Sequence, residues 1–298
     1  MSSKEKMTIA VYGRSFSDEF SENIKELFKK LQSHQLEVHI FEPFLKYTKN
    51  KALFDPLPQG TFTNSGDLNK NTDFVLSIGG DGTILESVSL VRNSGIPIIG
   101  INTGKLGFLA SIAKEEINDA VESIIEGEFE IEKRGLIQMP EPAGVFGDFN
   151  YGLNEVTIQK NDSRMISIHT YLDGEFLNSY WADGLIISTP TGSTAYSLSV
   201  GGPIITPDSG VFIISPIAPH NLTVRPVVIP DNKEITLEID KRHSNFLLSM
   251  DFNTAQIENN KKITLKKAPF YINLVNLKKH NFYSTLRNKL MWGVDKRN

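Results

Sequence analysis

A carboxylate set in a glycine turn is the feature of this chain that points most directly to chemistry. Residues 79–83 read Gly-Gly-Asp-Gly-Thr, directly after the apolar run 74–78 and directly before apolar residues at helical spacing, Ile84, Leu85, Val88 and Val91. Glycines allow a sharp bend and let an anionic ligand approach the backbone N–H groups, and the start of a helix favours phosphate. Because a carboxylate repels phosphate, Asp81 would need to handle a hydroxyl proton or a cation, which indicates phosphoryl transfer. The alternative is that Asp81 only caps the helix that begins near Thr83.

A second group of residues suited to ligand binding lies at positions 181–199, Trp-Ala-Asp-Gly-Leu-Ile-Ile-Ser-Thr-Pro-Thr-Gly-Ser-Thr-Ala-Tyr-Ser-Leu-Ser. A strand is predicted to end in this Pro/Gly turn, and a helix is predicted to open near Ala195. Small hydroxyl side chains suit ribose and phosphate oxygens, and Tyr196 is suited to flank a ring. Taken alone, Ser and Thr in turns are more often structural. The pair Asn154-Glu155 suits a ribose diol or a metal, but a polar pair at a strand edge is the commoner explanation.

Composition and charge are those of a soluble enzyme. With 298 residues, 40% of them hydrophobic, two domains with sizeable cores are expected. A net charge of -4 argues against a nucleic-acid partner, and no apolar run is long enough to span a bilayer or to form a signal peptide. We therefore expect a cytoplasmic protein with no nucleic-acid or membrane partner. The absence of cysteine excludes disulfides, thiolate catalysis and cysteine-ligated metals.

The first 130 residues alternate strand and helix signals. Strands are predicted at residues 8–13, 36–41, 74–78 and 96–101, and helices near 20–31, 84–91 and 117–125. Residues 42–70 lack periodicity and are expected to form a long loop near the ligand. This order implies parallel strands with crossover helices, in which ligands bind beyond the carboxyl ends of the strands. The glycine turn at 79–83 and the turn at 102–108, Asn-Thr-Gly-Lys-Leu-Gly-Phe, both fall at that edge.

From about Phe129 the pattern changes to many short strands with turns between them. A hairpin is predicted from residue 166 around Asp173-Gly174, and further strands at 153–158, 185–188, 211–215, 235–239, 246–250 and 263–265. We expect a Rossmann-like α/β domain over residues 1–130, with a parallel sheet and flanking helices, and an all-β, sandwich-like domain over residues 131–275. The signals at 271–275 and 283–290 are expected to return the chain to the first domain, with residues 276–298 packing on it.

Taken together, these segments closely resemble the NAD kinase family. Residues 79–83 match its Gly-Gly-Asp-Gly-Thr motif, 102–108 its Asn-x-Gly-x-Leu-Gly-Phe turn, Asn154-Glu155 its Asn-Glu/Asp pair, and 183–199 its long hydroxyl-rich signature. The first motif also occurs in lipid kinases and phosphofructokinases, whereas the last is far more specific. The resemblance runs from the first strand to Leu286 and is weakest at 42–70 and 141–149.

The resemblance implies an enzyme that phosphorylates the 2′-hydroxyl of the adenosine ribose of NAD with ATP, giving NADP and ADP. A divalent cation, Mg²⁺ or Mn²⁺, would bind the nucleotide phosphates, and no residue is assigned as a metal ligand. Asp81 would be the general base, Gly82 would allow NAD to approach closely, and Phe108 would form an apolar wall near the adenine. Asn154 and Glu155 would hold sugar hydroxyls and the amide of NAD. The other residues of the NAD site would be Arg164, Asp183, Thr191, Thr194, Ala195, Tyr196, Ser197, Leu198, Ser199, Ala218 and Asn253.

The resemblance also implies an ATP site and an assembly. The residues near the ATP phosphates would be Gly79, Gly80, Thr83, Asn102, Thr103 and Gly104, and we expect Lys105 to add a positive charge there. Residues 1–130 would bind nucleotide and phosphate. Residues 131–275 would bind NAD and assemble the chain as a homodimer or homotetramer.

Two positions depart from the family pattern. Phe252, in the sequence Ser-Met-Asp-Phe-Asn at 249–253, replaces a small residue, and this puts the role of Asn253 in doubt. Trp181 stands where some members have a basic residue. The loss of this charge alters the balance between substrates or the sensitivity to NADPH, or else Trp181 is simply a packed aromatic. A lipid or sugar kinase would lack the 183–199 signature, and an NAD(P)-sensing module would lack Asp81. A hydride-transferring enzyme has no support, since Gly13-Arg14-Ser15 replaces the Gly-x-Gly-x-x-Gly fingerprint after the first strand.

Overall fold

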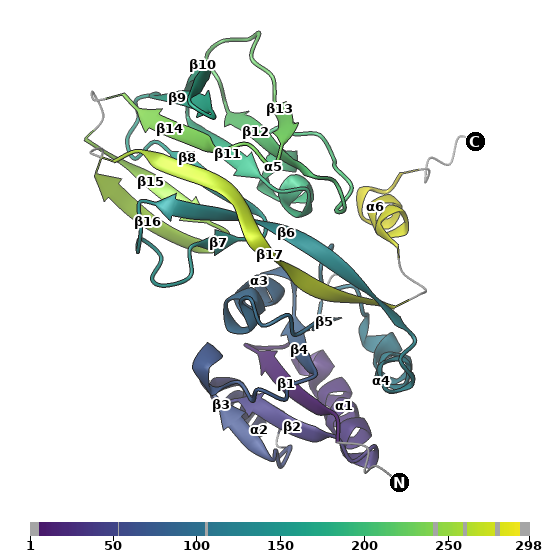
Figure 1. Ribbon diagram of the computed structural model, residues 1–298. Helices are drawn as coiled ribbons and strands as arrows, with labels where there is room; N and C mark the ends of the chain where they lie inside the picture. Colours follow the sequence, from purple (N-terminus) through teal and green to yellow (C-terminus); the bar gives the residue numbers. More distant parts are fainter. Residues whose placement is uncertain are drawn as a thin grey trace. The chain divides into compact units, whose positions relative to one another are not determined.

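The computed structural model describes residues 6–52, 54–104, 107–240, 244–258, 261–277 and 281–292 (Figure 1). The chain divides into two compact units. The first comprises Met1–Lys133 together with Ile272–Asn298, and the second comprises Arg134–Tyr271. Within the described ranges, no helix is both long enough and apolar enough to cross a membrane.

The sheet of the first unit is built on parallel strands, which confirms the expected arrangement. The described strands lie in the order β5-β4-β1-β2-β3, and each neighbouring pair is parallel. They are β1 (Thr8–Gly13), β2 (Glu37–Phe41), β3 (Gly60–Phe62), β4 (Phe74–Gly79) and β5 (Ile98–Asn102). β1, β4 and β5 are buried along their whole length, as parallel strands covered on both faces should be. Because Gly79 pairs with Asn102, the two predicted ligand turns leave the sheet side by side.

Helices bury their apolar faces in the core of the first unit. α1 (Ser21–Ser33) and α4 (Ile117–Glu126) bury apolar residues at helical spacing and contact each other. α3 (Asp81–Val91) follows β4 and buries Ile84, Val88 and Val91, as the sequence pattern predicts. The remaining helical segments are η1 (Asp18–Phe20), α2 (Glu42–Ala52), η2 (Ser65–Asp67) and η3 (Lys114–Glu116).

The prediction of a long loop at residues 42–70 is wrong, because this stretch contains α2, β3 and η2. Phe44 of α2 is 1% exposed. The hydroxyl of Thr48, one turn later, donates to the carbonyl oxygen of Phe44 at 2.9 Å. The Tyr47 hydroxyl donates to the carbonyl of Phe16 at 2.9 Å, which ties α2 to the loop after β1. Pro43 lies in the first turn of the helix, where a missing N–H costs nothing. Phe44, Leu45 and Tyr47 pack in the core of this unit, so a few apolar residues among lysines are sufficient for a helix.

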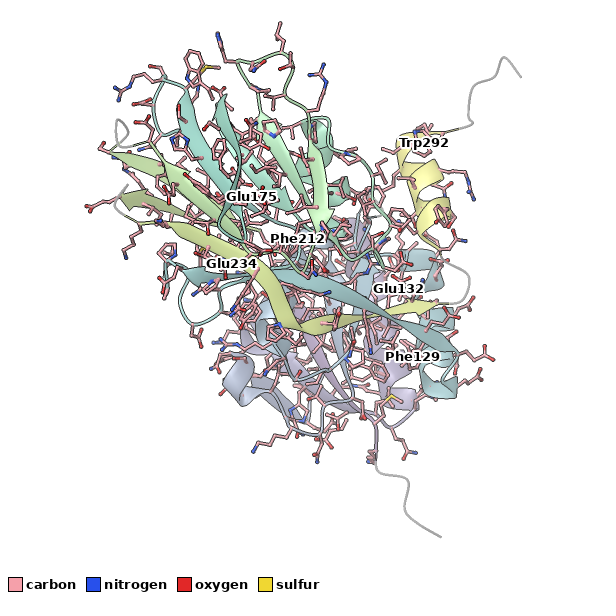
Figure 2. The ribbon with its side chains drawn as sticks, turned by 45° about the horizontal axis from the view of Figure 1, so that its top comes forward. Phe129, Glu132, Glu175, Phe212, Glu234 and Trp292 are labelled. Carbon is pink, nitrogen blue, oxygen red and sulfur yellow. The ribbon has the colours of Figure 1, made fainter. Side chains whose placement is uncertain are left out.

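The second unit consists of two antiparallel sheets around one core, as predicted. One has the order β13-β12-β11-β8-β15-β16. In the other, β10 (Glu175–Ala182) pairs with β9 (Ile166–Leu172), β9 with β14 (Ile235–Ile239), and β14 with the first part of β17 (Ile263–Leu277). Both sheets contribute to the core, for example Phe212 (Figure 2) and Leu237. The first sheet and its neighbouring helical turns contain β8 (Glu155–Gln159), β11 (Gly184–Ser188), η4 (Thr191–Thr194), α5 (Tyr196–Ser199), β12 (Val211–Ile217), β13 (Val227–Pro230), β15 (Asn245–Met250) and β16 (Asn253–Glu258).

The second sheet contains the predicted hairpin. Its strands are β9 (Ile166–Leu172), β10 (Glu175–Ala182) and β14 (Ile235–Ile239). Asp173 and Gly174 both have positive φ, 49° and 83°, and positive φ at both central residues is what a two-residue type I′ hairpin requires. The turn therefore forms because Asp and Gly tolerate positive φ, and the same property made the Asp-Gly pair a hairpin signal in the sequence.

Two long strands carry the chain between the units. β6 (Phe129–Glu141) leaves the first unit and pairs with β7 (Tyr151–Gly152) in the second. β17 (Ile263–Leu277) joins into one strand the two separate strands predicted at 263–265 and 271–275. It pairs with β14 through Leu265 and with β5 through Leu274, so the chain returns to the first unit as expected (Figure 1). α6 (Phe282–Leu290) follows and belongs to that unit.

Candidate active site

The glycine turn after β4 is shaped by close packing against Thr83. A Cβ at Gly79 would come within 2.1 Å of the Thr83 hydroxyl oxygen, so a larger residue does not fit. The Thr83 N–H donates to the carbonyl of Gly80 at 3.0 Å, and the Thr103 N–H donates to the carbonyl of Gly79 at 3.4 Å. Apart from the chain neighbours and the backbone of α3 itself, no atom of the described residues lies within 4 Å of a Cβ built at Gly80 or Gly82, which leaves room for a ligand at this turn.

Asp81 binds the neighbouring loop and does not cap its own helix. Its Oδ2 accepts the N–H of Phe108 at 2.8 Å, and its Oδ1 accepts the N–H groups of Leu109 and Ala110 at 3.0 and 2.9 Å. α3 has Gly80 at its N-cap and no side-chain cap. A Cβ at Gly107 would come within 1.7 Å of Asp81 Oδ1, so the loop reaches the carboxylate only because residue 107 is glycine. The carboxylate therefore joins the two turns into one assembly.

A cavity lies beside the turn at the end of β5. The buried Asn102 accepts the N–H of Gly104 on its Oδ1 at 2.7 Å, which fixes the turn. The adjoining cavity has a volume of about 320 Å³, and Ser17, Asn102, Thr103, Gly104 and Lys114 are among the residues that line it. Lys105, expected to add charge here, lies outside the described residues.

Arg14 is a basic residue at this edge of the sheet that the sequence analysis did not assign to the site. Its Nε donates to Glu86 Oε2 at 2.8 Å, and the Tyr12 hydroxyl donates to the same oxygen at 2.8 Å. Burial and the hydrogen bond to Glu86 raise the pKa of Tyr12 to about 12. Gly13 pairs with Ile78, so Arg14 leaves β1 next to Gly79. The position of Arg14 directly after the first parallel strand was the feature of the sequence that could have assigned it to the site.

A second carboxylate in the second unit binds three consecutive amides. Asp251 lies in the turn between β15 and β16. Its Oδ2 accepts the N–H of Leu153 at 2.7 Å, and its Oδ1 accepts the N–H groups of Asn154 and Glu155 at 2.8 and 3.1 Å. Successive amides of a strand point in opposite directions, so their convergence on one side chain shows that residues 153–155 form a bend.

The hydroxyl-rich segment binds the carbonyl side of the same bend. The Thr189 N–H donates to the carbonyl of Asn154 at 2.9 Å, and the Thr189 hydroxyl donates to the carbonyl of Leu153 at 2.6 Å. A Cβ at Gly192 would come within 2.2 Å of the Asn154 carbonyl oxygen. Glycine is therefore required for the approach of this turn, and motifs far apart in the sequence form one cluster around Asn154.

Glu155 has a buried carboxylate oxygen without a partner. No described residue makes a hydrogen bond to its Oε2. Burial, and next the nearby Asp251 carboxylate, raise the pKa of Glu155 to about 8, although the Tyr196 N–H donates to it. Burial also raises the pKa of Asp251 to about 6, against the opposing effect of its three amides. An unpaired buried polar atom destabilises the protein, so Oε2 is a position where a hydrogen-bonding group of a ligand would be favourable.

The comparisons with known proteins agree with this geometry. The model of the ATP-NAD kinase N-terminal domain matches residues 17–129, and that of the ATP-NAD kinase C-terminal domain matches residues 153–277. The chain belongs to the NAD kinase family. The NAD kinase of Cytophaga hutchinsonii is 47% identical over 98% of this chain and 100% of its own length. The NAD kinase of Flavobacterium psychrophilum is also 47% identical, with the same two coverages.

Two solved structures of NAD(H) kinases share the fold. An NAD kinase from Archaeoglobus fulgidus in complex with ATP has a TM-score of 0.74 at 25% identity, covering 96% of this chain and 99% of that one. Yeast NADH kinase complexed with NADH has a TM-score of 0.84 at 23% identity, covering 99% of this chain and 90% of that one. At that identity the yeast structure shows a common fold.

The other residues that the NAD kinase resemblance assigns to NAD lie in varied surroundings. Asp183 forms an ion pair with Lys160, with Nζ and Oδ1 2.6 Å apart. Arg164 is exposed and forms an ion pair with Asp162 in the same loop. Ser197 is fully buried, and its hydroxyl lies 3.1 Å from that of Ser215. η4 contains Thr191 and Thr194, and α5 contains Tyr196, Leu198 and Ser199, with Ala195 between the two helices. Ala218 follows β12, and Asn253 begins β16.

The structure also shows the surroundings of three aromatic residues. Trp181 packs against His220 with ring centroids 4.2 Å apart and the ring planes tilted by 52°, which supports the packed-aromatic explanation, although 51% of Trp181 is exposed. Phe252 is 49% exposed in the turn that holds Asp251. The ammonium of Lys289 lies 4.8 Å from the ring centroid of Phe108, a cation-π contact on the proposed adenine wall.

Proposed function

We propose that this chain phosphorylates the 2′-hydroxyl of the adenosine ribose of NAD with ATP, producing NADP and ADP. The observation that carries the proposal is the cluster around Asn154, where the bend, the hydroxyl-rich segment and the unpaired Glu155 Oε2 together offer partners to a sugar. The chain is 47% identical over nearly its whole length to proteins named NAD kinase, which supports the same substrate.

The first unit handles the phosphoryl donor. The open backbone at Gly80 and Gly82 and the cavity beside Asn102–Gly104 suit the phosphates of ATP, since N–H groups at a helix start favour anions. Thr83, Thr103 and Gly79 complete this turn. Arg14 would add a positive charge at the same edge, because Glu86 already orients its guanidinium. The Archaeoglobus fulgidus relative was solved with ATP.

Asp81 accepts the proton of the attacking hydroxyl. A carboxylate offers about four acceptor positions. Two amides use Oδ1 and one uses Oδ2, so the position that remains is on Oδ2. In the reaction the hydroxyl oxygen bonds to the γ-phosphorus of ATP, its proton passes to Asp81 Oδ2, and ADP leaves. The three amides hold the carboxylate in one orientation. This keeps Asp81 aligned with the attacking hydroxyl, and alignment supplies much of the rate gain in phosphoryl transfer.

The second unit binds the acceptor. Glu155 Oε2 would form a hydrogen bond with a sugar hydroxyl, and the Asn154 amide would bind a second polar group of NAD. Asp183, Arg164, Ala218 and Asn253 are proposed as further contacts, with η4 and α5 supplying hydroxyl groups and Tyr196. We also propose a homodimer or homotetramer assembled through this unit.

A divalent cation, Mg²⁺ or Mn²⁺, is proposed as the cofactor and would neutralise charge on the phosphates of ATP. In the described ranges no group of three His, Asp or Glu side chains could hold a metal ion. The residues present fit a cation that is carried mainly by nucleotide phosphates and water, as Mg²⁺ often is.

The test is the conversion of NAD to NADP by purified protein with ATP and magnesium, measured with an NADP-specific coupled enzyme. Parallel reactions with NADH and with inorganic polyphosphate define the acceptor and donor range. Binding of NAD without any NADP formation would contradict the proposal and favour a sensing module.

Asp81→Asn tests the base. We expect turnover to fall by roughly two to four orders of magnitude, while calorimetry still detects NAD binding. Since the variant also places an amide against the loop N–H groups, its melting temperature is measured alongside. An unchanged rate would exclude Asp81 as the base.

A further inference from the structure

Asp251 holds the segment of the Asn154-Glu155 motif through hydrogen bonds to residues 153–155, and it belongs to neither sequence motif of the second unit. We propose that Asp251 is the positioning residue of the acceptor site, because it holds residues 153–155 in the bend that presents Asn154 and Glu155 to NAD. The inference rests on the proposed function, since it takes NAD as the ligand of this bend.

The hairpin that carries Asp251 is fixed beside β8. β15 pairs with β8 in antiparallel register from Leu247 with Gln159 to Met250 with Val156. The next pair in this register is Asp251 with Glu155, and the Asp251 N–H donates to the Glu155 carbonyl at 3.1 Å. The backbone hydrogen bond and the three side-chain hydrogen bonds thus lock the turn and the bend together.

The backbone of residue 251 is adapted to this contact. Its φ of 49° lies in the left-handed region, which most side chains avoid and which Asp tolerates better than most. The same turn would accept glycine or asparagine, but a glycine has no oxygen for the three amides. The carboxylate is the group that satisfies all three, and N–H bonds to a charged acceptor are the stronger kind.

Asp251 also acts on the charge of the acceptor group. The charge acting on Glu155 comes from Asp251, whereas α5 contributes the Tyr196 N–H. Loss of the Asp251 charge should therefore make Glu155 easier to ionise, an effect that a purely structural residue elsewhere in the unit would not have. This gives the positioning role a signature separate from stability.

Loss of Asp251 should leave the rest of the unit assembled. The carbonyl side of the bend keeps its bonds to Thr189, and the ladder between β15 and β8 does not depend on the side chain. The expected damage is thus local to Asn154 and Glu155, and it should appear in the use of NAD and not of ATP.

The experiment compares Asp251→Asn with wild type and with Asp208→Asn, an exposed aspartate of the same unit that serves as a matched charge control. Wild-type conversion of NAD to NADP is measured first, so that a failure of the proposed function is recognised separately. We expect Asp251→Asn to raise the KM for NAD by about tenfold to a hundredfold with the KM for ATP within about twofold of wild type. The midpoint of the pH profile of the NAD KM should move to lower pH.

An unchanged KM for NAD, an equal rise in both KM values, or an unmoved pH midpoint would overturn the proposal. A measurement on the wild type covers the case in which the variant does not fold. By NMR, the amide protons of Leu153, Asn154 and Glu155 should titrate together with the Asp251 carboxyl, whose pKa burial raises to about 6, and should respond to NAD. Amide shifts that are independent of pH and of NAD would refute the positioning role.

Discussion

Replacing Glu155 by glutamine should stabilise the second unit in a pH-dependent way. Burial and the Asp251 carboxylate raise the pKa of Glu155 from 4.5 to about 8. The folded protein therefore keeps a proton that the unfolded chain has already released. Stability falls as the pH rises from 4.5 towards 8, by about 1.4 kcal/mol for each pH unit. Glutamine has no such proton, so Glu155→Gln avoids this loss.

The size of the effect follows from the same values. At pH 7, about 2.5 units above the ordinary pKa, the variant should be more stable than wild type by about 3 kcal/mol. Below pH 4.5 the difference should vanish. Asp251 is present in both proteins, so its own titration largely cancels in the difference. Glutamine has nearly the same size and shape as glutamate, which preserves the local packing.

Tryptophan fluorescence in urea measures the transition. The chain has two tryptophans, and Trp181 belongs to the same unit as Glu155, so Trp292→Phe in all proteins leaves a probe of that unit. Glu258→Gln, at an exposed residue of β16, controls for the loss of one negative charge and should change stability by less than about 0.5 kcal/mol. A Glu155→Gln protein equal to or less stable than wild type at pH 7, or a difference independent of pH, would refute the reasoning.

Three further substitutions test other contacts. Gly107→Ala would place a Cβ 1.7 Å from Asp81 Oδ1, so the rate of NADP formation should fall at least about tenfold and the free energy of unfolding by about 1–3 kcal/mol. In the control Gly135→Ala the new carbon has open space around it, so both the rate and the stability should stay unchanged. Thr189→Val leaves the buried Leu153 carbonyl and the Gly192 N–H without their partner, so the free energy of unfolding, measured by thermal denaturation, should fall by about 1–3 kcal/mol. The control Thr189→Ser keeps both hydrogen bonds and should lower the free energy of unfolding by less. Arg14→Ala should raise the KM for ATP about tenfold with little change in the KM for NAD, and equal effects on both would exclude Arg14 from the donor site.

Local patterns in the sequence were sufficient to predict most of the strands and helices of the first unit. The apolar runs of β1, β4 and β5 and the spacing of Ile84, Val88 and Val91 fix strands and a helix, because a parallel sheet covered on both faces leaves no polar alternation. α2 was missed because few of its residues are apolar, and the reason they form a helix lies in partners such as Phe16, remote in the chain.

The candidate site divides in the same way. The glycine turn pointed to Asp81 from residue types alone, whereas Asn154 and Glu155 were assigned only through the resemblance to the NAD kinase family. The partner of each could not be read from the sequence. The amides that bind Asp81 are 27 to 29 positions away, and Asp251 is about a hundred positions from the bend it holds.

The sequence by itself determined that a carboxylate stands in a phosphate-type turn and that a hydroxyl-rich segment follows a buried strand. Only the tertiary structure decided which groups these side chains meet: Asp81 binds the amides of a loop, Asp251 binds those of a bend, and Glu155 Oε2 has no hydrogen-bond partner among the described residues. The physical reason is that hydrogen bonding and burial depend on which distant backbone groups meet, and strand register sets this in the folded chain.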